Sequence, residues 1–361
     1  MNRVATIVAC LVLVSALSCT SLQVRSAPVA VVTAGPTEPE VFRSGDWSMT
    51  MPLGLQADSA YVPEDNPMTD AKIALGKALY FDRRLSKDAT IACASCHRPY
   101  HGFADPHAVS EGVDQQLGGR NSPTVINRLF SAEQFWDGRA EDLERQAHGP
   151  ITNPVEMAMP NHEAAIVRLE AVRGYEPLFV DAFGDRTIDL DRIGKAIAAY
   201  ERTVLAGDSP FDRYQAGDRD ALSPAAVRGL ALFNGAANCV TCHAGFNFTD
   251  ESYHNIGVGM DASVPDLGRF VETNDDLDRG AFKTPTLRNV AHTAPFMHDG
   301  SEPTLAAVVE FYDRGGVPNA NLSDEIVPLE LSVSGRRDLV AFLEALTGTV
   351  TNIAPPTSLP Q

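Results

Sequence analysis

The stretch Cys93-Ala94-Ser95-Cys96-His97 decides the fold, and it recurs as Cys239-Val240-Thr241-Cys242-His243. Each copy reads Cys-x-x-Cys-His, the spacing at which two thiols attach covalently to one c-type haem. The histidine that follows can then bind the iron as an axial ligand. The alternatives are a zinc site and a disulfide pair, but a four-cysteine zinc site does not need both trailing histidines. The doubled motif predicts two covalent haems, attached through Cys93, Cys96, Cys239 and Cys242, with His97 and His243 on the irons.

The composition is that of a globular protein with room for two domains. The chain has 361 residues, 44% of them hydrophobic. It has six cysteines, and the two outside the motifs, Cys10 and Cys19, lie in the first twenty residues, so no pair is left for a structural disulfide in the folded part. The formal net charge of -18 argues against binding to nucleic acid or to an anionic membrane surface. It favours a soluble protein with a basic partner, although it could equally serve solubility alone.

The N-terminus predicts export to the periplasm. Arg3 precedes an apolar stretch, residues 4–17, which is too short to span a membrane as a mature helix. We interpret residues 1–26 as a signal peptide. Residues 16–19 also resemble a lipobox, so a lipid anchor on Cys19 and a plainly cleaved signal peptide both remain open. Residues 27–65 are rich in Pro, Val, Ser and Thr without periodicity, and we expect a flexible linker there.

An internal repeat gives the architecture. Helices are expected over residues 71–81 and 225–233, each just before a haem motif, with N-caps at Thr69 or Asp70 and at Ser223. Each half also closes with an apolar-periodic helix, over residues 188–204 and 335–346. The sequence therefore predicts an all-α fold of two cytochrome c-like domains, each with one covalent haem, long loops and little strand. The expected boundaries are 66–215 for the N-terminal domain, 216–349 for the C-terminal domain and 350–361 for a disordered tail.

The residues between and after the haem motifs resemble the bacterial di-haem cytochrome c peroxidase family, which includes the MauG-like enzymes. The resemblance covers about residues 62–348. It rests on Phe135-Trp136-Asp137-Gly138-Arg139, on the Gln146 to Glu156 segment, on Lys283-Thr284-Pro285-Thr286-Leu287-Arg288-Asn289, and on Thr293-Ala294-Pro295-Phe296-Met297-His298-Asp299-Gly300.

The resemblance implies roles for particular residues. It assigns Gln146 and Glu156 to the distal pocket of the N-terminal haem, where peroxide would react. A carboxylate there can move the proton that heterolytic cleavage of the O–O bond requires. The resemblance also makes Trp136 the electron relay between the haems, a role compatible with plain core packing. Finally, it implies one Ca²⁺ held by Asn121, Thr293 and Pro295, through oxygen atoms as a hard cation prefers.

The sequence departs from the peroxidase pattern at both haems. Val113 stands where many family members carry a distal histidine, and His101 and His107 are expected to be surface residues. The N-terminal haem should then lack a sixth protein ligand. At the C-terminal haem Tyr312 matches the usual distal methionine, as in MauG-like enzymes, and Met297 is the rival ligand.

These features predict a periplasmic di-haem peroxidase. It would reduce hydrogen peroxide with electrons from a small cytochrome c or a cupredoxin. One alternative is a MauG-like enzyme that oxidises residues of a partner protein, and a second is a non-catalytic di-haem electron carrier. The presence of Glu156 and Gln146 counts against the carrier. A homodimer is compatible with the resemblance, and nucleic acid is not an expected partner.

Overall fold

The computed structural model describes residues 35–361. The expected signal peptide, Cys19 and the first residues of the expected linker therefore lie outside the described residues. Within residues 35–361, no helix is long and apolar enough to cross a membrane.

The described chain is mostly helical with little strand, as predicted. The α-helices are α1 (Asp70–Tyr80), α2 (Cys93–Cys96), α3 (Leu143–Gln146), α4 (Gly149–Thr152), α5 (His162–Glu170), α6 (Tyr175–Phe183), α7 (Leu190–Glu201), α8 (Pro210–Gln215), α9 (Pro224–Asn234), α10 (Phe270–Thr273), α11 (Leu305–Asp313) and α12 (Val333–Glu344). The strands are β1 (Val41–Ser44), β2 (Trp47–Thr50), β3 (Ala206–Gly207), β4 (Tyr253–His254), β5 (Phe282–Lys283) and β6 (Thr349–Val350). They pair antiparallel in twos, β1 with β2, β3 with β6 and β4 with β5.

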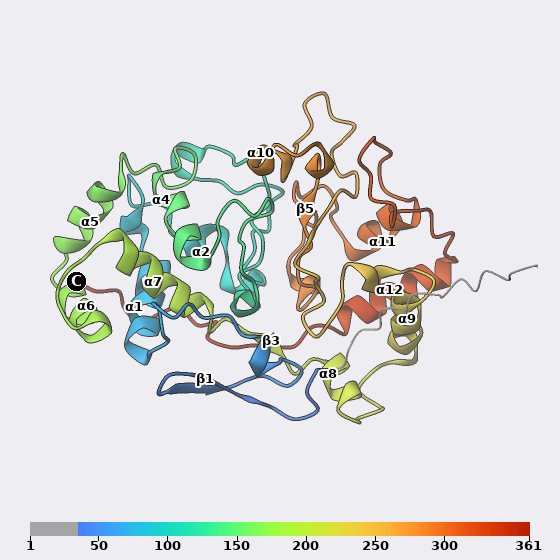
Figure 1. Cartoon of the computed structure of the whole chain (residues 1–361), viewed down its shortest axis with the longest axis horizontal. Coiled ribbons are helices and arrows are strands. Elements are labelled where there is room, and N and C mark those ends of the chain that lie inside the picture. The colour runs from blue at the N-terminus through green and yellow to red at the C-terminus, as the bar shows by residue number, and fades with distance from the viewer. Residues whose placement is uncertain (1–34) are drawn as a thin grey trace, which may run out of the picture.

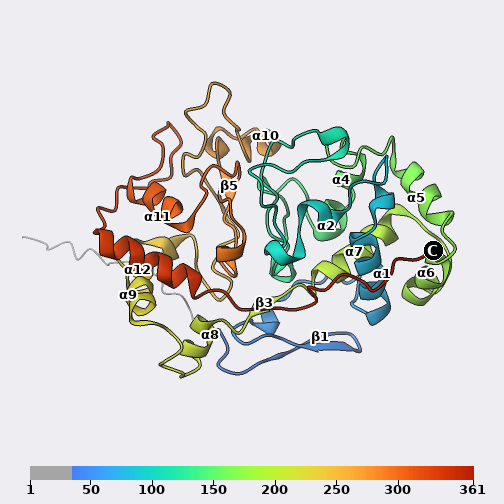
Figure 2. The same cartoon turned by 180° about the vertical axis from the view of Figure 1, so that it is seen from behind.

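Two groups of helices lie side by side, with long loops between them (Figures 1 and 2). One group holds α1 and α4 to α7, and the other holds α9, α11 and α12. Single turns of 3-10 helix interrupt the loops: η1 (Ala57–Ser59), η2 (Arg83–Leu85), η3 (Pro99–His101), η4 (Val113–Gln115), η5 (Arg128–Phe130), η6 (Cys239–Thr241), η7 (Asp276–Asp278) and η8 (Val290–His292).

In the first group, α1 crosses α7 at very close range. The predicted N-cap is confirmed, because the Thr69 side chain accepts a hydrogen bond from the backbone N–H of Lys72. A Cβ atom on Gly76 would lie 1.8 Å from the carbonyl oxygen of Ala196, so only glycine lets the two backbones approach this closely. The side chains around the crossing form a continuous hydrophobic core that includes Leu79 and Ile197.

The second group repeats this arrangement with α9 and α12. Ser223 caps α9 as predicted, with Pro224 in the first turn. A Cβ atom on Gly229 would lie 1.9 Å from the carbonyl oxygen of Asp338, which matches the Gly76 contact in the first group. A separate core surrounds this crossing and includes Phe233 and Phe342. The repeat seen in the sequence therefore corresponds to a repeated helix crossing.

The expectation of a flexible linker is wrong for the part of residues 27–65 that the structure describes. Residues 41–50 form the antiparallel hairpin β1–β2, with Val41 opposite Thr50. Phe42, Met51 and Leu55 are buried and pack with residues from α7 and the following loop. The segment lacks helical periodicity because its backbone hydrogen bonds are made between two paired strands rather than within a helix. Packing of its apolar residues against the rest of the protein holds it in place.

The expectation of a disordered tail is also wrong. Thr349 and Val350 pair with Gly207 and Ala206, which link the two helix groups. The chain then runs back across the first group and ends beside α6, as the red trace shows (Figures 1 and 2). At its end the backbone N–H of Gly174 donates to the carbonyl oxygen of Gln361 at 2.9 Å. The C-terminal residues therefore form a strap from the second helix group to the first.

The loops that follow the two Cys-x-x-Cys-His motifs meet between the helix groups. The backbone N–H of Asn121 donates to the carbonyl oxygen of His298 at 2.7 Å, and that of Lys283 donates to the carbonyl oxygen of Trp136 at 2.8 Å. Arg120 pairs with Asp266 at 2.6 Å across the same boundary. The segments expected to carry the site are thus brought together by backbone and ionic contacts.

Candidate haem sites

The first motif presents one histidine nitrogen to a cavity. The backbone N–H of His97 donates to the carbonyl oxygen of Cys93 at 2.9 Å, which turns the chain so that all three side chains line one cavity. His97 Nδ1 lies 3.0 Å from the carbonyl oxygen of Pro123. Burial lowers the pKa of His97, so the ring is neutral, and an Nδ1–H donated to Pro123 leaves Nε2 free for a metal.

The second motif repeats this geometry. The backbone N–H of His243 donates to the carbonyl oxygen of Cys239 at 2.9 Å. His243 Nδ1 lies 3.0 Å from the carbonyl oxygen of Phe248, and burial lowers the pKa of this imidazole as well. Two separate cavities therefore each have a pair of thiols and an imidazole with a free Nε2.

The described cysteines form neither a disulfide nor one four-cysteine zinc site. All four are unpaired thiols, and each pair lines a different cavity. Burial raises the pKa of Cys96 to about 11 and that of Cys239 to about 12. Buried, separate thiol pairs suit thioether bonds to two porphyrins.

The first cavity has a volume of about 520 Å³ and walls that suit a haem. Ile91, Val125 and Ile197 are among its apolar lining residues. Arg128 also lines the cavity, and its buried Nε has no hydrogen-bond partner in the part of the chain that the structure describes. A haem would cover the apolar walls and bring its carboxylates as acceptors for unpaired cationic donors.

Glu156 and Gln146, which come from separate segments, line this first cavity together. Asn153 Nδ2 donates to Glu156 Oε1 at 2.8 Å. This hydrogen bond orients the carboxyl group and leaves Oε2 free to bind another partner. Burial raises the pKa of Glu156, and the charge of Arg139 opposes this shift. Gln146 ends α3, and its side-chain amide has no hydrogen-bond partner among residues 35–361. The pocket thus combines a partly buried carboxyl group with a free amide.

No imidazole other than that of His97 lines this cavity among the described residues. Val113 is buried, and its backbone N–H donates to the carbonyl oxygen of Glu156 at 3.0 Å. His107 is exposed, as expected, with its Nδ1 2.8 Å from Asp105 Oδ1. The expectation of a surface position is wrong for His101, because its Nε2 lies 2.6 Å from the carbonyl oxygen of Ala294 in the second half.

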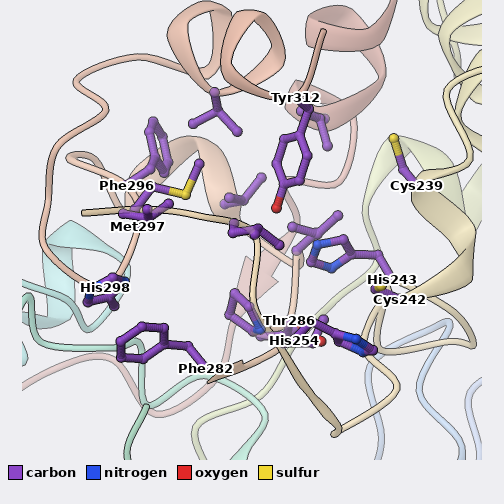
Figure 3. A pocket seen from close by; sticks show the side chains of 18 of the residues that line it. Cys239, Cys242, His243, His254, Phe282, Thr286, Phe296, Met297, His298 and Tyr312 are labelled. Atoms are coloured by element: carbon purple, nitrogen blue, oxygen red, sulfur yellow. The ribbon is translucent and has the colours of Figure 1, made fainter. Parts of the chain in front are cut away.

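The second cavity, of about 220 Å³, contains both candidate distal ligands. Tyr312 projects from α11 with its hydroxyl toward the His243 ring, whereas Met297 lies beside Phe296 on the side of His298 (Figure 3). Burial raises the pKa of Tyr312. Within the described chain the Tyr312 hydroxyl has no hydrogen-bond partner, so its oxygen is available to a metal.

Trp136 lines both cavities. Its indole Nε1 donates to the carbonyl oxygen of Asn121 at 2.8 Å, and its own carbonyl oxygen accepts from the N–H of Lys283. The side chain is thus held by the first half, and the backbone of the same residue is held by the second half. Trp136 therefore lies between the two cavities.

The three expected calcium-binding residues line the second cavity near the same boundary. Asn121 Nδ2 donates to the carbonyl oxygen of His107 at 2.9 Å, which orients the amide. Asn121 Oδ1 accepts no hydrogen bond from residues 35–361. Amide and carbonyl oxygens of the kind that Asn121, Thr293 and Pro295 carry are ligands that Ca²⁺ accepts.

Sequence reasoning assigned no role to several charged residues that line the cavities, among them Arg128, Glu201 and Lys283. Lys283 lines both cavities and was noticed only as part of a family motif. Glu201 and Arg128 have no motif of their own, because they meet through the packing of α7 against the loop that contains η5. The one local signal in the sequence was Glu201 itself, a charged residue at the C-terminal end of an otherwise apolar-periodic helix.

Comparison with known proteins agrees with this geometry. The family model described as di-haem cytochrome c peroxidase matches residues 70–220. The methylamine utilization protein MauG of Methylorubrum extorquens is 43% identical over 297 residues, which cover 81% of this chain and 83% of that protein. The cytochrome c551 peroxidase of Nitrosomonas europaea is 40% identical over 296 residues, which cover 81% of this chain and 84% of that protein.

Solved structures also match. The crystal structure of a MauG-like protein associated with microbial copper homeostasis superposes with a TM-score of 0.76 at 33% identity, over 82% of this chain and 95% of that one. Two cavities, each with a Cys-x-x-Cys-His motif, and similarity at this level over at least 81% of the chain lead to one conclusion. The chain belongs to the di-haem cytochrome c peroxidase family, a family of oxidoreductases that implies a c-type haem at each of the two motifs.

Proposed function

We propose that this chain is a periplasmic di-haem peroxidase that reduces hydrogen peroxide to water at its first haem site. Two electrons and two protons are consumed for each peroxide, which gives two water molecules. The observation that supports this proposal most is the pairing of Glu156 and Gln146 in the first cavity, where His97 is the sole imidazole among the described lining residues. A peroxide molecule thus has room opposite His97.

When bound, the haem supplies the iron at which the O–O bond is reduced. The chain moves the proton. Asn153 holds Glu156 Oε1, so Oε2 takes the proton from the attacking peroxide and returns it to the leaving oxygen. The raised pKa of Glu156 makes it a stronger base than an ordinary carboxylate, and Gln146 orients the peroxide with its amide.

Electrons would enter through the second haem and cross by way of Trp136. The expected donor is a small cytochrome c or a cupredoxin, and the formal net charge of -18 favours a basic one. In this proposal residues 66–215 and 216–349 are the two haem domains, and His243 and Tyr312 would hold the second haem iron.

Calcium would join the halves through Asn121, Thr293 and Pro295. If so, chelation should slow electron transfer between the haems, and added Ca²⁺ should restore it. Identical transfer rates before and after chelation, in protein shown by elemental analysis to have lost the ion, would remove calcium from the proposal.

The position of Tyr312 favours a second candidate function, oxidation of residues in a partner protein as a MauG-like enzyme. An anionic oxygen ligand stabilises ferric and higher oxidation states, so the second haem would be a poor acceptor from ordinary cytochromes. It would then share oxidising equivalents with the first haem instead. A non-catalytic electron carrier would not need Glu156 and Gln146 in the first cavity.

Steady-state kinetics of the purified holoprotein separate these functions. We expect peroxide-dependent oxidation of a reduced small cytochrome c or cupredoxin, and loss of this turnover in Glu156→Gln. Slow donor oxidation together with peroxide-driven, stable oxidation of both haems would favour the MauG-like function. If neither haem reacts with peroxide, the remaining function is that of a non-catalytic electron carrier. Fractionation of cells is the test of a periplasmic location, and extraction with detergent tests a lipid anchor.

A further inference from the structure

Glu201 is a buried carboxyl group without a partner in the wall of the first cavity. It ends α7, is 5% exposed and lines the cavity. Its carboxyl oxygens accept no hydrogen bond and form no ion pair in the described part of the chain. Buried carboxyl groups are normally paired, because an isolated charge in a low-dielectric interior is costly.

The neighbouring arginine does not neutralise Glu201. Arg202 donates to both carboxyl oxygens of Glu144, at 2.7 and 2.9 Å, and this pair is itself buried. Glu144 also accepts a hydrogen bond from Asn66. Glu144 therefore takes Nη1 and Nη2 of Arg202, whereas the buried Nε of Arg202 has no hydrogen-bond partner in the described chain. Glu201 makes no hydrogen bond to Arg202 and lines the cavity.

The charged and titratable groups around Glu201 are known. On its own helix is Tyr200, and from α1 comes Tyr80; both phenols have a raised pKa, mainly from burial. From the α2 segment comes Cys93, and α3 contributes the paired Glu144. The other cation that acts on Glu201 is Arg128, which lines the same cavity with an unpaired buried Nε.

The balance of these influences keeps the carboxyl group protonated at neutral pH. Burial raises the pKa of Glu201 to about 8, while Arg202 and then Arg128 oppose this rise. In the chain alone Glu201 is thus protonated at neutral pH, and the added positive charge of an oxidised haem iron would favour its ionised form.

We propose that Glu201 is a positioning residue that couples the uptake of a proton to the uptake of an electron at the first haem site. One-electron reduction of this site adds one negative charge, and Glu201 takes up a proton from solvent to offset it. Oxidation of the site by one electron releases that proton again. The electrons come from the redox partner or the second haem, and Arg128 sets the pH range in which the coupling acts. This inference rests on the haem assignment but not on peroxide turnover.

The test is the midpoint potential of the first haem as a function of pH. Glu156 can also titrate in this cavity, so the parent protein for the test carries Glu156→Gln. Because the reduced site holds the proton more tightly, a rise in pH should lower the potential. We expect a slope that approaches about 59 mV for each tenfold change in proton concentration, in the pH range between the pKa values of Glu201 in the oxidised and reduced states.

Adding Glu201→Gln to this parent should flatten the slope in the same pH range. Adding Glu133→Gln is the matched control and should leave the slope unchanged, because Glu133 is paired with Tyr253 and Arg269 and does not line the cavity. A slope that persists in the Glu156→Gln/Glu201→Gln protein, or a parent without any slope, would overturn the proposal.

Two further measurements guard against misfolding of the Glu201 variant. In wild-type protein, the infrared difference between the reduced and oxidised states should contain the carbonyl stretch of a protonated carboxylic acid, and its absence would contradict the proposal. Arg128→Gln removes a cation that lowers the pKa of Glu201, so the sloping region should move to higher pH. A sloping region at the original pH would exclude Arg128 from this role.

Discussion

Glu156 carries the proposed chemistry at the scale of a single residue. General acid–base catalysis typically accelerates a reaction by about 10²–10⁴-fold. We therefore predict that Glu156→Gln lowers kcat/KM for peroxide by about that factor, while the spectra of both haems stay as in wild type. Glu163→Gln, an exposed substitution on α5, is the control and should not change the rate. A loss of less than tenfold would exclude Glu156 from the mechanism.

The same residue sets the acid limb of the pH–rate profile. The carboxylate form is the base, so the rate rises with pH through the pKa of Glu156. Since burial raises this pKa, the limb should lie at higher pH than an ordinary glutamate would give, and it should vanish in Glu156→Gln.

A second prediction for a single residue concerns Tyr312. A thioether is neutral and favours ferrous iron, whereas a phenolate favours ferric iron. Axial ligands tune haem potentials over a range of about 0.8 V, so Tyr312→Met should raise the potential of the second haem by on the order of 0.1 V or more. Potentiometry and the optical spectrum of a His/Met cytochrome provide the measurement.

Two companion variants distinguish the rival ligands. Met297→Leu should leave the potential and the low-spin signal of the second haem unchanged. If Tyr312→Phe also leaves both unchanged, the ligand lies elsewhere, and Met297 becomes the next candidate.

At the scale of structural elements, the loop after the first haem motif determines whether the first iron is open. Val113 is buried against the backbone of Glu156, and His101 is bonded to Ala294. We predict that the resting ferric first haem is high-spin, because no second imidazole reaches it. Electron paramagnetic resonance of the oxidised protein tests this, with His101→Ala as a control that should not alter the signal. Two purely low-spin signals would show that another residue caps the iron.

The repeated helix crossings give a stability prediction. Gly76→Ala would put a methyl group against the carbonyl oxygen of Ala196, a backbone atom that cannot turn away. Overpacking of this kind typically costs about 1–3 kcal/mol. We expect a matching loss in the free energy of unfolding, measured by denaturant titration. Gly119→Ala, where the added methyl group meets open space, should cost much less. Equal stabilities of the two variants would contradict the close crossing.

The elements differ in how far the sequence could predict them. Helices α1, α7, α9 and α12 were predicted because their apolar residues recur at helical spacing and their N-caps are local. The β1–β2 hairpin was not predicted, because its stability depends on burial of Phe42 against distant residues. The C-terminal strap was missed for a similar reason, since the partner strand of Val350 lies more than a hundred residues away.

At the scale of the whole molecule, the two halves depend on each other. The first half supplies Trp136 and Asn121 to the boundary, and the second supplies Lys283 and the carbonyl groups near Pro295. The local chemistry of each haem motif could be predicted from five consecutive residues. The buried carboxyl group of Glu201 could not, because its burial in the cavity wall and its lack of a hydrogen bond follow only from tertiary packing.

The central claim is that the first haem site reduces peroxide with two electrons from a donor. The most direct measurement is a titration of the reduced holoprotein with limiting hydrogen peroxide, in the presence of an excess of a reduced donor. We predict that each peroxide oxidises two equivalents of a one-electron donor, and that Glu156→Gln abolishes this fast consumption while both haems remain attached. Wild-type protein that carries both haems and yet consumes no donor when peroxide is added would contradict the claim.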